Sequence, residues 1–304
     1  MVAVRISLVA VLLASATVGL QLVAVQPAAA VPGLERVVGT SPLSGHQPFK
    51  EATVQCPFDR HVIGGGAVIN DGNRKLVRLT GLEPLAFNSP VSHQDMFIAY
   101  AEAPNLNSPY NWTLTVYAMC AYRDLLDAGN YTIVSNFTFG SQTFQTAAAR
   151  CPKGTVAYGA SATISTQAHV GGGLRVGQAD GQVGLQLNRT SGPLDISRAT
   201  GRESPTGYNK PWELRSYAIC SATHGGIHAQ ATISQGASAS DTCHNPVIPS
   251  FVHGPGGGGG LSDGGPVWLR EIRPRPDMTG EDVALTGPPI GGMVAYETCA
   301  ANTQ

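Results

Sequence analysis

The chain has 304 residues, a formal net charge of −1, 37 Gly, 21 Pro and 13% charged residues. Nucleic-acid binding needs a concentrated basic surface, so this charge balance argues against a nucleic-acid partner. Helix-favouring residues are scarce and turn-favouring residues are common, which predicts an all-β fold.

The first 30 residues have the pattern of a secretory signal peptide. Arg5 is the only charge, an apolar run extends from Ile6 to Val25, and Ala28–Ala30 offer small residues for cleavage. An uncleaved membrane anchor is the alternative, because the run approaches the roughly 20 residues that span a bilayer. We expect cleavage, secretion to an extracellular or envelope-associated location, and no membrane insertion afterwards.

An internal repeat organises the remaining chain. Cys56 to Ala121 begins with Cys-Pro, contains Gly-Gly-Gly-Ala and ends with Tyr-Ala-Met-Cys-Ala, and Cys151 to Ser221 follows the same order. Cys243 to Ala300 is a divergent third copy. Each copy should be one structural unit. The predicted boundaries are 1–30 for the signal peptide and 31–125, 126–222 and 223–304 for three β repeats.

The cysteines fall two in each copy, and their even number in an exported chain favours disulfides. Equivalent copies should form equivalent bonds, which predicts the pairs Cys56–Cys120, Cys151–Cys220 and Cys243–Cys299. The alternative joins neighbouring copies, with the pairs Cys120–Cys151, Cys220–Cys243 and Cys56–Cys299.

The last strand of each copy shows the clearest alternation. Trp112 and Trp212 share a face with the closing cysteines, so we expect both rings in the core. Glu213, Arg215 and Tyr217 fall on the opposite face, which we expect to be partly exposed to solvent.

Six or seven short strands per copy fit a small β-sandwich in which the disulfide joins an early strand to the last. The sequence therefore predicts three tandem sandwiches. A single β-prism with pseudo-three-fold symmetry is the alternative.

The Cys-Pro start, the glycine patch and the closing Tyr-Ala-Met-Cys-Ala resemble repeats of small secreted actinobacterial proteins, which generally have no assigned activity. The Cys-Pro start is also similar to that of vitelline membrane outer layer proteins, which implies a three-fold prism. The third copy departs from the pattern, because His244 replaces the proline and Gly256–Gly260 replaces the ordered patch. Neither resemblance implies catalytic residues.

Motifs for chemistry are weak. Gly254–Gly259 matches Gly-x-Gly-x-x-Gly only within a glycine run, which we interpret as a flexible loop. His224 and His228 would approach each other only on a helix, which Gly225 and Gly226 disfavour, so we predict no metal site. A glycosidase could use paired carboxylates, but we expect ordinary surface roles for the candidates Glu83, Asp95, Glu102, Asp180, Asp195 and Glu203. We predict no cofactor and no enzyme activity.

The best candidate contact surface is a repeated loop before the last strand. Tyr110 and Asn111 in the first copy match Tyr208 and Asn209 in the second. Exposed rings and amides suit sugars or peptides. Arg270, Arg273 and Arg275 form a local basic cluster that Glu271 and Asp277 flank, and we expect it to be a solvated strand edge.

We therefore expect a secreted, non-catalytic binding or structural module that contacts extracellular or cell-envelope components such as glycans. A secreted hydrolase acting on polysaccharide or peptide is the alternative. Close carboxylates, or a histidine–carboxylate pair in a cleft of one copy, would favour the hydrolase, and equivalent shallow loops would favour binding. The ligand and the oligomeric state stay open.

Overall fold

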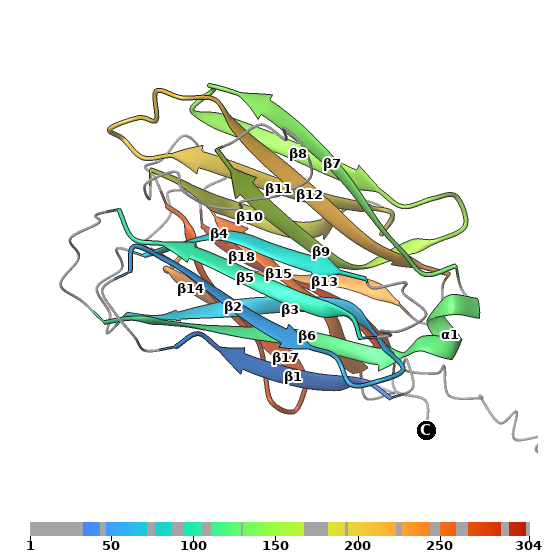
Figure 1. Ribbon diagram of the computed structural model, residues 1–304. Helices are drawn as coiled ribbons and strands as arrows, with labels where there is room; N and C mark the ends of the chain where they lie inside the picture. Colours follow the sequence, from blue (N-terminus) through green and yellow to red (C-terminus); the bar gives the residue numbers. More distant parts are fainter. Residues whose placement is uncertain are drawn as a thin grey trace, which may run out of the picture.

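The structure is a computed structural model and describes residues 33–42, 47–71, 77–86, 94–104, 111–128, 130–166, 182–191, 194–222, 227–243, 250–259, 267–286 and 292–301. These residues form strands and one short helix (Figure 1). The all-β fold is confirmed. Within the described ranges, no helix has the length and hydropathy that crossing a membrane would require.

Each repeat contributes six strands. The first repeat contains β1 (Glu35–Thr40), β2 (Phe49–Gln55), β3 (Arg60–Asn70), β4 (Arg78–Leu85), β5 (Met96–Glu102) and β6 (Thr113–Tyr122). Helix α1 (Arg123–Ala128) follows. The second repeat contains β7 (Thr132–Gly140), β8 (Phe144–Arg150), β9 (Val156–Ser165), β10 (Val183–Ser191), β11 (Ile196–Glu203) and β12 (Trp212–Ser221). The third contains β13 (His228–Ser234), β14 (Ser238–Thr242), β15 (Ser250–Gly259), β16 (Leu269–Pro274), β17 (Gly280–Leu285) and β18 (Met293–Ala301).

The repeats share their sheets. Three antiparallel sheets have the strand orders β1-β6-β3-β16-β17-β14, β2-β5-β4-β9-β12-β7 and β13-β18-β15-β10-β11-β8. Every repeat places its first, sixth and third strands in one sheet and its fourth, fifth and second strands in another. The third strand of one repeat pairs with the fourth strand of a neighbour, as β3–β16, β9–β4 and β15–β10.

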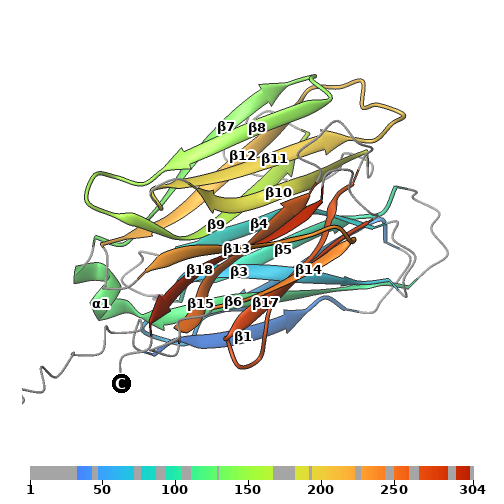
Figure 2. The ribbon, with the colours of Figure 1, turned by 180° about the vertical axis from the view of Figure 1, so that it is seen from behind.

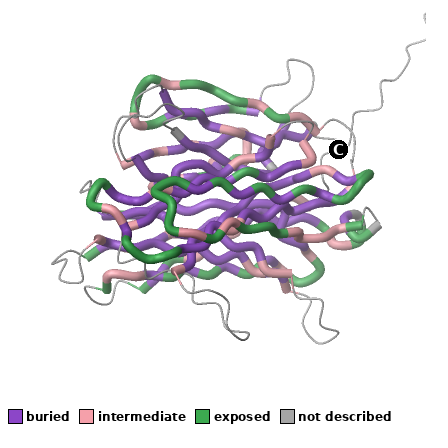
Figure 3. Tube along the Cα trace, turned by 90° about the horizontal axis from the view of Figure 1, so that it is seen from above, coloured by how far each residue is buried: buried purple, intermediate pink, exposed green. Residues whose placement is uncertain are grey.

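This cyclic exchange makes the three repeats one body. The expected two-layer unit exists within each repeat, but its layers continue into the neighbouring repeats, so the picture of separate tandem sandwiches needs correction. The arrangement corresponds to the alternative, a single pseudo-three-fold body. Most of the described buried hydrophobic residues, drawn from all three repeats, accordingly belong to one continuous core, and Figure 3 shows exposed residues mainly along edges and turns.

The predicted disulfides Cys56–Cys120, Cys151–Cys220 and Cys243–Cys299 are all confirmed. In the first repeat, Cys56 follows β2 of one sheet and Cys120 lies on β6 of another, so the bond joins the two layers. Trp112 and Trp212 are 2% and 0% exposed, which confirms their place in the core.

Three equivalent strands, β3, β9 and β15, contact one another at the centre of the body. They approach so closely that a Cβ on Gly159 would lie 3.0 Å from the Cα of Gly64, and one on Gly254 would lie 2.8 Å from the Cα of Gly159. Only residues without a side chain fit there. The prediction of a flexible loop over Gly254–Gly259 is therefore wrong, because this glycine run is the buried strand β15.

The edges of adjacent sheets meet at the first hairpin of each repeat. Asn136 and Thr138 on β7 donate side-chain hydrogen bonds to the carbonyl oxygens of Ala148 and Thr146 on β8, at 3.0 and 2.8 Å. In the third repeat, Gln230 on β13 donates to the carbonyl of Thr242 at 2.9 Å. These bonds satisfy edge carbonyl groups that would otherwise be free to pair with another chain.

The outer face of the sheet that contains β12 is less exposed than expected. Glu213 and Tyr217 are only 4% and 7% exposed. The hydroxyl groups of Tyr217 and Tyr100 donate to the two carboxylate oxygens of Glu83, at 3.1 and 3.0 Å. Burial, reinforced by the charge of Glu83, raises the pKa of both tyrosines. Polar groups on this face are thus paired with one another across two repeats.

Gly159→Val should lower the free energy of unfolding by about 1–3 kcal/mol or more, because the valine side chain would meet backbone atoms of β3. Gly140→Ala is the matched control, since a Cβ there meets nothing within 4 Å, and it should change the free energy of unfolding by less than about 0.5 kcal/mol. Urea unfolding of both variants measures the difference. Equal losses would contradict the close approach of the central strands.

Candidate functional site

A hollow of about 490 Å³ lies in the second repeat and is lined by Gln182, Glu203, Thr206, Gly207, Tyr208, Asn209 and Lys210. It lies beside the start of β10 and the end of β11, and the loop that leads into β12 forms part of its wall. The second hollow, about 250 Å³, lies in the first repeat and is lined by Ser41, Pro42, Gln47, Phe49, Lys50 and Glu51.

A buried carboxylate holds the loop beside the larger hollow. Glu203 is 4% exposed, and its two oxygens accept hydrogen bonds from the backbone N–H of Tyr208 and from Nε1 of Trp212, each at 3.0 Å. Across the hollow, Oε1 of Gln182 accepts hydrogen bonds from the hydroxyls of Ser204 and, at 2.8 Å, Thr206. The loop is therefore fixed from both sides, while Asn209 and Lys210 are exposed.

The predicted contact residues have different environments. Asn111 and Asn209 are exposed as expected, whereas Tyr110 lies outside the described residues. Tyr208 is only 8% exposed and belongs to the hydrophobic core, so the expectation of an exposed ring is wrong there. The hydrogen bond from its backbone N–H to buried Glu203 explains the difference, because it draws the loop against the core.

A histidine cluster lies where the first two repeats join. His61 is fully buried, and its Nδ1 and Nε2 each lie 2.8 Å from a carboxylate oxygen, of Asp95 and of Asp127 on α1, respectively. The Tyr131 ring stacks on the imidazole with centroids 3.7 Å apart, and its hydroxyl donates to the carbonyl of Val62. Burial, together with the Asp95 charge, raises the pKa of Tyr131 well above its usual range.

This cluster has the histidine and the carboxylates of a catalytic triad, but neither its nucleophile nor its arrangement. A general base needs a ring nitrogen free to accept a proton from a nucleophile or water. Both nitrogens of His61 instead contact carboxylates, which accept hydrogen bonds only. The cluster therefore acts as a polar connection between β3 and α1.

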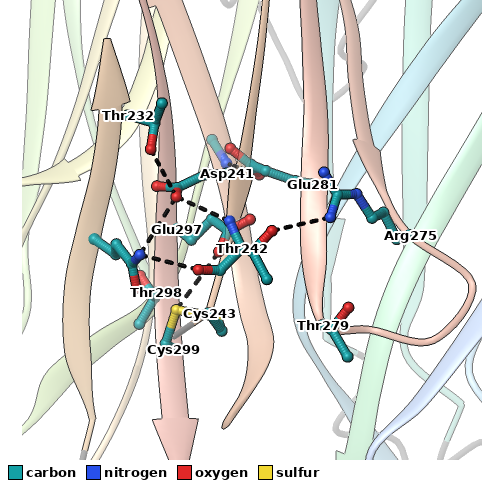
Figure 4. Close-up of a disulfide and its surroundings, with 12 residues drawn as sticks. Thr232, Asp241, Thr242, Cys243, Arg275, Thr279, Glu281, Glu297, Thr298 and Cys299 are labelled. Carbon is teal, nitrogen blue, oxygen red and sulfur yellow. Dashed lines mark hydrogen bonds between the residues drawn. A yellow bond between two sulfur atoms is a disulfide. The ribbon is translucent and has the colours of Figure 1, made fainter. Parts of the chain in front are cut away.

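The third repeat carries an interior acidic cluster of Asp241, Glu281 and Glu297, which are 4%, 0% and 1% exposed (Figure 4). Asp241 and Glu297 each lie two residues before a half-cystine. In the antiparallel register of β14 and β17, Asp241 lies directly opposite Glu281. The equivalent positions of the first repeat are Val54, Phe97 and Ala118. Three positions that hold apolar core residues in the first repeat thus hold carboxyl groups in the third.

The acidic cluster is only partly satisfied. Asp241 accepts from the Thr232 hydroxyl at 2.8 Å, and Glu281 accepts from the backbone N–H of Gly256 at 2.9 Å. One oxygen of each of the three carboxyls has no hydrogen-bond partner among the described residues. Burial raises the pKa of Glu281 well above its usual range, and burial with the Asp241 charge raises that of Glu297 to about 8.

The carboxylates considered for a glycosidase have other partners. Glu83 binds two tyrosines, Asp95 binds His61, Asp195 pairs with Arg150 and Glu203 holds the loop, while Glu102 is buried. Asp180 and His224 lie outside the described residues, and His228 begins strand β13 rather than a helix. None of the residues of the histidine and acidic clusters lines either of the two hollows.

The interior carboxyls were missed at the sequence level although a signal existed. Glu297 replaces the alanine of Tyr-Ala-Met-Cys and Tyr-Ala-Ile-Cys in the closing motif. Strand alternation alone places that residue on the face of the half-cystine, which points inward.

The acidic cluster should make stability depend on pH. A carboxyl whose pKa is higher in the folded than in the unfolded state makes its full contribution to folding stability below its unfolded-state pKa. This contribution is lost as pH rises through the folded-state pKa. For Glu297 the window runs from its ordinary value of 4.5 to about 8, with a slope of up to about 1.4 kcal/mol per pH unit. Glu297→Gln should therefore be more stable than the natural protein at pH 8, and the two should be similar at pH 4.

Urea unfolding at several pH values tests this dependence. Glu51→Gln is the matched control because Glu51 is exposed, and its pH profile should follow that of the natural protein. If Glu297→Gln also followed that profile, the raised pKa of Glu297 would be refuted.

No protein-family model matches the chain, and a search of curated proteins found no significant match. The arrangement of the residues is therefore the basis for the functional inference that follows.

Proposed function

We propose that the protein is a secreted, non-catalytic binding module and that the larger hollow is one of its contact sites for an extracellular or envelope glycan. The observation that carries the proposal is the pair of hydrogen bonds by which the Glu203 carboxylate fixes the loop from Tyr208 to Trp212. It fixes the backbone of the loop while Asn209 and Lys210 remain exposed at the hollow. Rigid scaffolds that present polar loop residues are typical of binding sites.

The lining of the hollow favours a ligand rich in hydroxyl groups. Gln182 and Asn209 carry amides, Thr206 carries a hydroxyl and Lys210 carries an amine. Amides both donate and accept hydrogen bonds, as sugar hydroxyl groups do. Three disulfides indicate an oxidising environment, which supports a partner outside the cytoplasm.

The hydrolase alternative has less support. A histidine–carboxylate cluster occurs where the first two repeats join, and close carboxylates occur in the third repeat, but their residues are absent from the linings of both hollows. His61 has no free ring nitrogen, and both oxygens of Glu203 accept hydrogen bonds from the protein itself. Binding without turnover fits these contacts better.

Asn209→Ala should weaken retention on a glycan array or on isolated cell wall by about three- to tenfold, the effect of losing one hydrogen bond. Asn111→Ala, at the matching position of the first repeat, tests whether that loop also contributes. If both loops engage one polymer, the double variant should lose more than the product of the two single effects.

Gln55→Ala is the control, because Gln55 is an exposed amide on β2, away from the hollow. All variants should melt as the natural protein does. Unchanged retention in the double variant would exclude these loops as the contact surface. Hydrolysis of the glycan by the natural protein would overturn the non-catalytic assignment.

A further inference from the structure

The sheet that contains β10 and β11 can be followed in Figure 2. Strand register places three arginines on its outer face. Arg189 on β10 lies directly opposite Arg198 on β11 in the antiparallel register. Arg202 lies four residues along β11 on the same face, a separation of about 13 Å. Arg198 is exposed, and the other two are partly exposed.

The described residues of this face include no acidic side chain that would neutralise the arginines. By strand alternation, the outward positions of the described strands β13, β18, β15, β10, β11 and β8 include no Asp or Glu. Arg150 lies nearby on β8 but pairs with Asp195. Arg189 stacks on the ring of Tyr296, with its guanidinium carbon 4.4 Å from the centroid.

Most other arginines in the described part of the chain form ion pairs, whereas Arg36 and Arg78 stack on the rings of Tyr117 and Trp268. Ion pairs are formed by Arg60, Arg123, Arg150, Arg215, Arg270, Arg273 and Arg275. The basic cluster noted in the sequence, Arg270 to Arg275, is thus neutralised by Asp71, Glu271 and Asp282. Arg189, Arg198 and Arg202 form no ion pair with any described residue.

Like charges directly opposite each other across two strands are destabilising. A bound anion would remove this repulsion, and the planar guanidinium group offers two parallel donors to a carboxylate or phosphate. Two arginines that lie opposite each other, without an ion-pair partner among the described residues, therefore have the chemistry of an anion site.

The arginine face ends near the hollow. Arg202 immediately precedes Glu203, which lines the hollow, and Lys210 adds a positive charge there. By strand alternation the side chain of Arg202 points to the face opposite that of Glu203, so the arginine face and the hollow are separate surfaces that meet near the end of β11.

We propose that this face binds an anionic glycan, a polysaccharide with carboxylate or phosphate groups along its chain. The proposal rests on the binding function inferred above and adds the charge of the ligand and a second surface. Several weak charged contacts along one polymer reinforce one another, which suits an open face better than a single small anion does.

The test measures binding of the purified protein to polygalacturonate, which carries carboxylates, to poly(glycerol phosphate), and to neutral dextran. The natural protein should bind at least one anionic polymer about tenfold more tightly than dextran and should lose affinity as salt rises. The preferred polymer identifies the acidic group. Equal binding to dextran, or tighter binding to duplex DNA than to either anionic polymer, would overturn the proposal.

Arg198→Gln and Arg202→Gln should each weaken binding to the anionic polymer by about tenfold, the effect of one charged hydrogen bond. Arg273→Gln removes the same charge from another sheet, where Asp282 and Glu271 pair with it, and should change binding less than about twofold. Equal losses in all three variants would mean that only net charge matters and would refute the site.

Thermal melting separates binding from a structural role. Arg198→Gln should melt at the same or a higher temperature than the natural protein, because it removes the repulsion from Arg189. A lower melting temperature would show that Arg198 has a stabilising partner and would contradict the inference.

The two proposals can fail separately. If Asn209→Ala lowers glycan retention while Arg198→Gln leaves polyanion binding intact, the hollow stands and the arginine face is refuted. If Arg198→Gln lowers polyanion binding while Asn209→Ala and Asn111→Ala change nothing, the arginine face stands without the hollow.

Discussion

The close approach of β3, β9 and β15 at the centre is the contact on which the rest of the structure depends. Backbone atoms meet there with no space for side chains, so each of these strands carries glycine at the contact. With the three strands held against one another, each pairs at its far edge with the fourth strand of a neighbouring repeat. The glycine patches therefore link the repeats and do not provide flexibility.

Sharing of sheets explains how the repeats could diverge in their interior. No repeat has a sheet of its own, and the disulfide of each repeat joins two layers that continue into its neighbours. Three inward positions that are apolar in the first repeat carry carboxyl groups in the third, and among the described residues a histidine cluster lies where the first two repeats join. Buried carboxyl groups without full hydrogen bonding lower stability, and we infer that the shared core and the three disulfides offset this cost.

The outer surfaces differ as well, and these differences bear on function. In the sheet that contains β12, outward polar groups are paired with one another through Glu83 and two tyrosines. In the sheet that contains β10 and β11, three arginines form no ion pair with any described residue, and the last of them, Arg202, lies next in sequence to Glu203 at the hollow. Unpaired charge on a rigid sheet next to a fixed polar loop is the arrangement expected of a surface that meets a charged ligand.

From the sequence alone, the all-β class, the three disulfides and the burial of Trp112 and Trp212 could be predicted, because repeat position and strand alternation are local properties. Only the tertiary structure decided that Gly254–Gly259 is a central strand, that Tyr208 is buried, and that Arg189 faces Arg198. Each of these depends on which distant strands become neighbours and in what register, and the exchange of strands between repeats determines both.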